Sequence, residues 1–166
     1  MSNYKRHYEF GNIVFITMIT DNRIPILTDN IDLIKESLKS VKYKFEIVAG
    51  VILQDHIHLL LKPQNMKDIP YIVGFFKGHF TKNVGRGLPR QYQKIWQNRY
   101  YDHIIRNEQD LNRHIDYIHY NPMKHYNIAP KNWKYSTFNK FVQMGMYEKE
   151  WCNFGDKNKI NDLDLE

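Results

Sequence analysis

The sequence has 166 residues, of which 42% are hydrophobic and 25% are charged, as in an ordinary globular protein built around one core. Its single cysteine, Cys152, excludes an internal disulfide and favours a reducing compartment. No apolar segment is long enough to span a bilayer, and no signal-like apolar segment follows the N-terminus. We therefore expect a cytoplasmic protein with no membrane partner.

Charge is distributed unevenly along the chain. The formal net charge is +6, but residues 1–147 carry +9 (21 basic against 12 acidic) and residues 148–166 hold six acids against three lysines. Residues 69–101 and 117–147 contain no acid, and aromatic side chains are interspersed among their basic residues. This composition suits the phosphates and unstacked bases of a nucleic acid, with a merely solvated basic surface as the alternative. The candidate DNA-binding residues are Lys77, Lys82, Arg86, Arg90, Lys94, Arg99 and Lys124.

The first half of the chain reads as a strand, a helix and a hairpin. Residues 12–20 are β-branched and aromatic without a breaker, which predicts the first strand. Asp29 or Asn30 can cap a helix that follows it. Residues 45–53 and 56–61 are two apolar runs that flank a two-residue turn, so we expect a hairpin.

The second half adds a helix, a strand and a final helix. A helix is predicted to begin around residues 68–70 and to end at residues 85–89, and residues 99–106 can form the fourth strand. Asn107 is a good cap for a last helix that Pro122 is expected to end. The order βαββαβ plus one helix predicts an α+β, ferredoxin-like antiparallel sheet with an additional C-terminal helix. We expect one domain over residues 1–147, followed by a polar, acidic tail over residues 148–166 that is loosely packed or disordered.

Two histidines on the third predicted strand form a candidate metal site. Side chains alternate along a strand, so His56 and His58 share one face while Ile57 points to the other. Two imidazoles about 7 Å apart can hold one ion when a third group approaches from elsewhere. The pair alone is a weak signal, because eight histidines in one chain produce such spacings by chance.

The last predicted helix offers a second half for that site. At 100° per residue, one flank of the helix carries Asp110, His114, Tyr117 and Asn121, next to a core stripe made by Leu111, Ile115 and Ile118. Tyr120 lies opposite the stripe and should face solvent, and its neighbour His119 lies off the far side. On this geometry Tyr117 is the better candidate nucleophile. The alternative is a boundary tyrosine that packs its ring and exposes its hydroxyl.

These residues and their neighbours resemble a known family. His56-Ile57-His58, the segment WQNRYYDH at residues 96–103 and the segment DYIHYNPMKH at residues 116–125 resemble the REP-associated tyrosine transposases. These proteins are relatives of the single-tyrosine HUH transposases of bacterial insertion sequences. The similarity extends over about residues 8–142, including the segment WKYSTF at residues 133–138.

The resemblance implies a bacterial, ferredoxin-like enzyme that cuts and rejoins single-stranded DNA at palindromic hairpins. It implies that His56 and His58 are metal ligands and that Tyr117 is the nucleophile. Asn121 takes the place of a third ligand, where the insertion-sequence enzymes usually carry glutamine. The cofactor would be Mg²⁺ or Mn²⁺, and the products would be a 5′-phosphotyrosine and a free 3′-OH.

Several alternatives stay open from the sequence. His103 and His114 can tune the site or be ordinary structural histidines. A ferredoxin-like sheet with basic and aromatic residues can also be a regulatory module that binds nucleic acid without cutting it. A zinc hydrolase is disfavoured, since no third histidine or cysteine lies at close ligand spacing. Both a monomer and a homodimer are compatible with the sequence.

Overall fold

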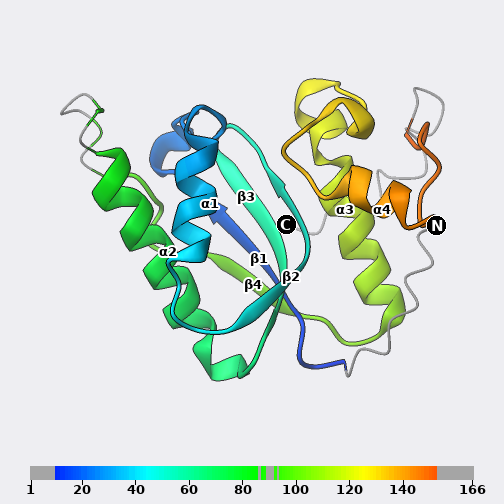
Figure 1. Ribbon diagram of the computed structural model, residues 1–166, viewed down its shortest axis with the longest axis horizontal. Coiled ribbons are helices and arrows are strands. Elements are labelled where there is room, and N and C mark those ends of the chain that lie inside the picture. Colours follow the sequence, from blue (N-terminus) through cyan, green and yellow to red (C-terminus); the bar gives the residue numbers. More distant parts are fainter. Residues whose placement is uncertain (1–9, 86, 89–91, 93, 153–166) are drawn as a thin grey trace.

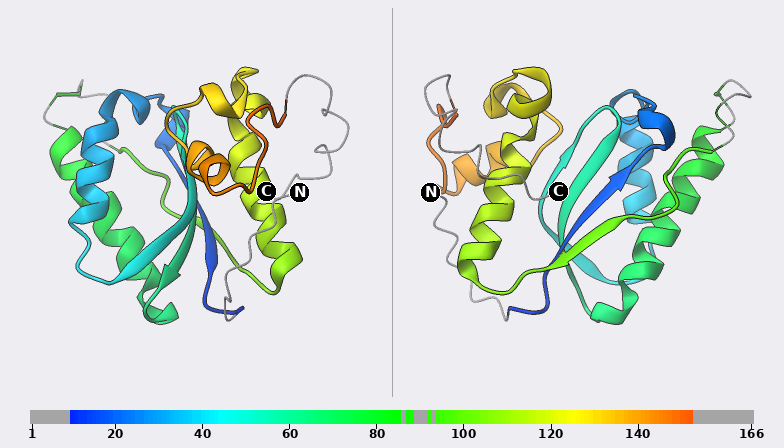
Figure 2. Two further views of the ribbon diagram at one scale, coloured as in Figure 1. Left: turned by 45° about the vertical axis from the view of Figure 1, so that its right-hand side comes forward. Right: turned by 180° about the vertical axis from the view of Figure 1, so that it is seen from behind.

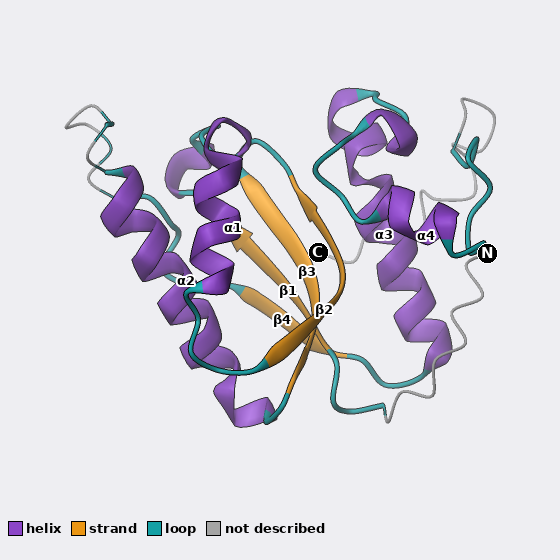
Figure 3. Cartoon of the chain, in the orientation of Figure 1, coloured by secondary structure: helices purple, strands orange, loops and turns teal. Residues whose placement is uncertain are grey.

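The computed structural model describes residues 10–85, 87–88, 92 and 94–152. Its four strands are β1 (Val14–Ile19), β2 (Phe45–Ile52), β3 (His56–Pro63) and β4 (Tyr101–Ile104), and they form one sheet in the order β2-β3-β1-β4 (Figure 3). Every neighbouring pair is antiparallel, and β3 lies between β1 and β2. This is the split βαβ arrangement, so the predicted ferredoxin-like α+β fold is confirmed.

Helices cover both faces of the sheet. α1 (Ile31–Lys39) and α2 (Ile69–Val84) pack on one face, while α3 (Glu108–Tyr126) and α4 (Phe138–Gln143) lie on the other (Figures 1 and 2). The sequence prediction did not include the short helix α4. Among the described residues, no helix is long and apolar enough to cross a bilayer.

Strict alternation along β1 and β3 divides the interior into two cores. Ile16 of β1 and Ile57 and Leu59 of β3 pack under α1 and α2. Their neighbours Phe15 and Leu60 belong to the core under α3 and α4. The rings of His56 and His58 lie 4.9 Å apart, so the prediction that they share a face is confirmed. That face is the one that α3 covers (Figure 1).

α3 begins where the sequence predicted but does not end there. The Asn107 side chain accepts a hydrogen bond from the Asp110 N–H at 2.9 Å, as expected of a cap. The expectation that Pro122 ends the helix was wrong, because α3 continues to Tyr126. Proline lacks the N–H of a helical hydrogen bond, so α3 passes through Pro122 with one backbone bond fewer, while the side chains of Pro122 and Met123 are buried.

His119 lies on the far side of α3, as the helical wheel predicted, but this side is buried too. Its ring is fully buried against Phe141, at 4.8 Å between centroids, and its Nε2 lies 2.8 Å from Thr137 Oγ1. Burial lowers the pKa of His119 to about 3. This side of α3 is buried because α4 and the segment after it cover it. Within that segment the rings of Tyr147 and Trp151 pack 4.7 Å apart, whereas residues 153–166 lie outside the described part of the chain.

Candidate active site

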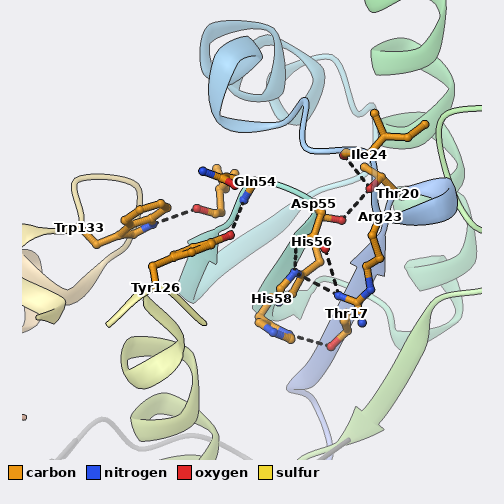
Figure 4. Close-up of polar contacts among 11 residues, drawn as sticks. Thr17, Thr20, Arg23, Ile24, Gln54, Asp55, His56, His58, Tyr126 and Trp133 are labelled. Atoms are coloured by element: carbon orange, nitrogen blue, oxygen red, sulfur yellow. Dashed lines mark hydrogen bonds and ion pairs between the residues drawn. The ribbon is translucent and has the colours of Figure 1, made fainter. Parts of the chain in front are cut away.

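His58 lies at the centre of the face under α3. Its Nδ1 is 2.8 Å from the Thr17 hydroxyl of the neighbouring strand β1, which leaves Nε2 as the atom able to bind a metal (Figure 4). Burial holds the pKa of His58 well below its ordinary value, and the charges of nearby His56 and His125 lower it further. The imidazole is therefore neutral at physiological pH, which is the form that ligates metals.

His56 is oriented by a carboxylate at the start of the same strand. Asp55 Oδ1 lies 2.6 Å from His56 Nδ1, so the Nε2 of His56 is likewise the metal-binding atom (Figure 4). Burial raises the pKa of Asp55, but hydrogen bonding and charge from His56 and Arg23 outweigh it, and the pKa is lowered. An ionised carboxylate behind a histidine fixes the tautomer and orientation that a metal ligand needs.

Tyr117 of α3 faces this histidine pair. Its ring is 1% exposed and lies 5.2 Å from the ring of His58. Asn121, one helical turn later, is fully buried, and its Oδ1 has no hydrogen-bond partner among the described residues. Tyr120 is half-buried on another side of the helix, where burial and the Cys152 thiol raise its pKa. The structure therefore brings together His56, His58, Tyr117 and Asn121.

Two neighbours of the site, Phe15 and His125, were missed by the sequence prediction. Phe15 of β1 packs its ring 5.5 Å from that of His58 and 6.0 Å from that of Tyr117. The ring of His125 lies 4.9 Å from that of His56. His125 follows Asn121 by four residues, so the helical wheel would have found it had the helix been continued past Pro122.

The C-terminal end of α3 is held against the hairpin that carries the histidines. The Gln54 N–H in the hairpin turn donates to the Tyr126 hydroxyl at 3.0 Å (Figure 4). Trp133 stacks on Tyr126 with ring centroids 5.0 Å apart and donates from Nε1 to the Ile52 carbonyl oxygen at 3.0 Å. These contacts fix the distance between the helix with Tyr117 and the strand with the histidines.

The predicted tuning residues His103 and His114 form a second cluster with Asp110. His103 Nε2 on β4 lies 2.9 Å from Asp110 Oδ2, and His114 Nδ1 lies 3.2 Å from Asp110 Oδ1. Burial raises the pKa of Asp110, but hydrogen bonds from His103 and the Arg106 N–H outweigh it and lower the pKa. The three ligand atoms lie within 4.8 Å of one another, so this cluster can hold a metal ion, and without one it ties β4 to α3.

The predicted DNA-binding residues do not form one surface. Lys124 is exposed, with Nζ 5.2 Å from the centre of the Tyr117 ring. Lys77 and Lys82 lie on α2, which covers the opposite face of the sheet (Figure 1). Lys94 forms an ion pair with Asp21 at 2.9 Å. Arg99 is exposed, whereas Arg86 and Arg90 lie outside the described residues.

Comparisons with known proteins identify the family of the chain. The family model described as "Transposase IS200 like" matches residues 11–121. The REP-associated tyrosine transposase of Escherichia coli K12 is 33% identical over 157 residues, or 92% of each chain. A Haemophilus influenzae protein named for the same class is 38% identical over 165 residues, covering 91% of this chain and 93% of that one.

A solved structure agrees with these sequence comparisons. It is that of a REP-associated tyrosine transposase bound to a REP hairpin, and it matches with a TM-score of 0.76 and 33% identity over 92% of each chain. The sequence matches and the structural match span the same domain, including the histidine strand and the helix with Tyr117. The chain therefore belongs to the IS200-like transposase family, among the REP-associated tyrosine transposases.

Proposed function

We propose that this protein is a metal-dependent endonuclease and strand transferase that acts on single-stranded DNA at palindromic hairpins through a 5′-phosphotyrosine. The observation that carries the proposal is the contact between Tyr117 and His58 on the face that also holds His56. The hairpin substrate is inferred from the solved relative bound to a REP hairpin. We expect the protein to be bacterial. Its oligomeric state is either a monomer or a homodimer.

His56, His58 and Asn121 would hold the metal. The donor set fits, because both histidines have Nδ1 beside an oxygen partner and so can offer Nε2, and the buried Asn121 Oδ1 lacks a hydrogen-bond partner among the described residues. Two imidazoles favour Mn²⁺ over Mg²⁺ in affinity, whereas availability in a cell favours Mg²⁺. When bound, the cation supplies positive charge that polarises the scissile phosphodiester.

The residues of the chain supply the nucleophile and its position. The Tyr117 oxygen attacks the phosphorus, the P–O3′ bond breaks, and the leaving 3′ oxygen takes a proton while the tyrosine hydroxyl loses one. The new phosphotyrosine retains the phosphoester, so reversal of the step by another 3′-OH rejoins the strand without ATP. Packing against Phe15 and His58 restricts the ring, which reduces the entropy lost on reaching the reactive geometry.

A trapping experiment tests the proposal. End-labelled hairpin DNA with single-stranded flanks is incubated with the protein and Mn²⁺, and covalent adducts are separated under denaturing conditions and mapped by peptide mass. We expect an adduct on Tyr117 that disappears in Tyr117→Phe, whose ring still packs. An adduct on Tyr120, Tyr100 or Tyr126, or none with the parent protein, contradicts the proposal.

The second candidate function is a module that binds hairpin DNA without cutting it. The burial of Tyr117, at 1% exposure, favours it, because a nucleophile must first be uncovered to reach DNA. Such a module would bind DNA equally well with Tyr117→Phe and would form no adduct. The trapping experiment therefore separates the two functions.

A further inference from the structure

The turn at Asp21–Arg23 brings an arginine to the edge of the candidate site. Arg23 Nη1 lies 3.3 Å from Asp55 Oδ2 and 3.5 Å from His56 Nδ1 (Figure 4). The Arg23 side chain is 51% exposed, so its head touches the histidine pair on one side and water on the other. Neither the charge pattern of the sequence nor the histidine spacing pointed to this residue.

The backbone that carries Arg23 is held in an unusual conformation. Asn22 and Arg23 have φ values of 51° and 55°, a left-handed region that non-glycine residues rarely adopt. The buried Thr20 hydroxyl lies 2.9 Å from the carbonyl oxygens of both Ile24 and Asp55, and the Thr20 N–H donates to the Asp55 carbonyl oxygen at 2.9 Å. These bonds connect the strained turn to Asp55, the residue before His56. The Arg23 side chain is therefore held next to His56.

The contacts of the guanidinium leave most of its donors available. Both contacts use Nη1, and Nε and Nη2 form no hydrogen bond to any described residue. The ion pair with Asp55 is partly exposed, and such pairs exchange partners at small cost. A guanidinium fork is the side chain best matched to two oxygens of a phosphate.

A row of side chains crosses the site with a cation at each end. Arg23 contacts His56, His56 packs against His58, His58 packs against Tyr117, and the Lys124 ammonium lies over the Tyr117 ring. We propose that Arg23 binds a backbone phosphate of the substrate strand at the His56 end of this row. The inference rests on the proposed function for its ligand, a phosphodiester strand, but not on the cleavage step.

Binding without metal tests this assignment independently of cleavage. Affinity for labelled hairpin DNA is measured in EDTA as a function of salt, for the parent, Arg23→Gln, Arg23→Lys and the control Lys39→Gln. Lys39 is an exposed cation on α1, across the sheet. We expect Arg23→Gln to weaken binding about tenfold and to reduce the salt slope by about 0.7, the value for one phosphate contact on a single strand. Arg23→Lys should keep the slope, and Lys39→Gln should match the parent.

Two further measurements separate phosphate binding from a structural role. Mn²⁺ affinity by calorimetry and the melting temperature should not fall in Arg23→Gln relative to the parent, because Arg23 donates no metal ligand. An unchanged salt slope in Arg23→Gln, or a fall in its Mn²⁺ affinity or melting temperature that accounts for the weaker binding, overturns the assignment. A parent that binds the hairpin but forms no adduct with Mn²⁺ refutes strand transfer alone, and a parent that does not bind the hairpin overturns both.

Discussion

The two faces of the sheet are built from the same strands but differ in kind. The face under α1 and α2 is packed by aliphatic and aromatic side chains such as Ile16, Leu59 and Phe80. The face under α3 buries polar groups among its apolar ones, including His58 and Asn121 at 0% exposure. Burying a polar group costs free energy unless it is hydrogen-bonded or binds a ligand. The comparison indicates that the α1–α2 face is a mainly apolar core, whereas the α3 face combines an apolar core with buried polar groups.

The first prediction concerns a substitution in the apolar core under α1 and α2. Phe80 is fully buried and packs 5.4 Å from the ring of Trp96, so Phe80→Ala should lower the free energy of unfolding by about 3–5 kcal/mol. Urea denaturation measures this loss. Phe75 on the same helix is 44% exposed, and Phe75→Ala should cost far less. Equal losses for the two variants would show that this face is not the stabilising core.

The second prediction addresses the polar face. His58→Ala should weaken Mn²⁺ binding by about a hundredfold, because one of the two proposed imidazole ligands is removed. Calorimetry measures the affinity, and urea denaturation should show a smaller loss of stability than for Phe80→Ala. His79→Ala, a partly exposed histidine on α2, is the matched control and should bind Mn²⁺ like the parent. Undiminished Mn²⁺ affinity in His58→Ala would refute the assignment of His58 as a metal ligand.

The third prediction concerns the link between β4 and α3. Asp110→Asn weakens the contacts to His103 and His114, so the helix that carries Tyr117 is held less firmly and adduct formation should slow about tenfold. Glu108→Gln, an exposed acid in the same turn, should have no such effect. Calorimetry on the same proteins counts Mn²⁺ per chain. A second Mn²⁺ that is lost only in Asp110→Asn would show that the cluster is a metal site rather than a structural link.

The smallest effect is expected at Tyr120. It shares α3 with Tyr117 but is half-buried on another side of the helix, next to Cys152. Tyr120→Phe should therefore leave the rate of adduct formation within about a factor of two and the stability within about 0.5 kcal/mol. A rate assay and a urea curve check both values. Loss of the adduct in Tyr120→Phe would indicate that Tyr120, rather than Tyr117, is the nucleophile.

Local periodicity alone determined much of this molecule. The period of two along β3 placed His56 and His58 on one face, and the period of 3.6 along α3 placed Tyr117 and Asn121 together. The cap at Asn107 was equally local, because the side chain bonds to the backbone three residues away. Such features depend on neighbours within a few residues, so the sequence predicts them.

Only the tertiary structure decided how the polar face is completed. Arg23 and Phe15 reach the site from segments outside β3 and α3, and no spacing in the sequence relates them to His58. His119 lies on the far side of α3, as the helical wheel predicted, but its burial depends on α4, a later segment that folds over this side. The helix likewise continues past Pro122, since burial of the Pro122 and Met123 side chains outweighs one missing backbone bond. Long-range contacts set these outcomes, and a local pattern does not contain them.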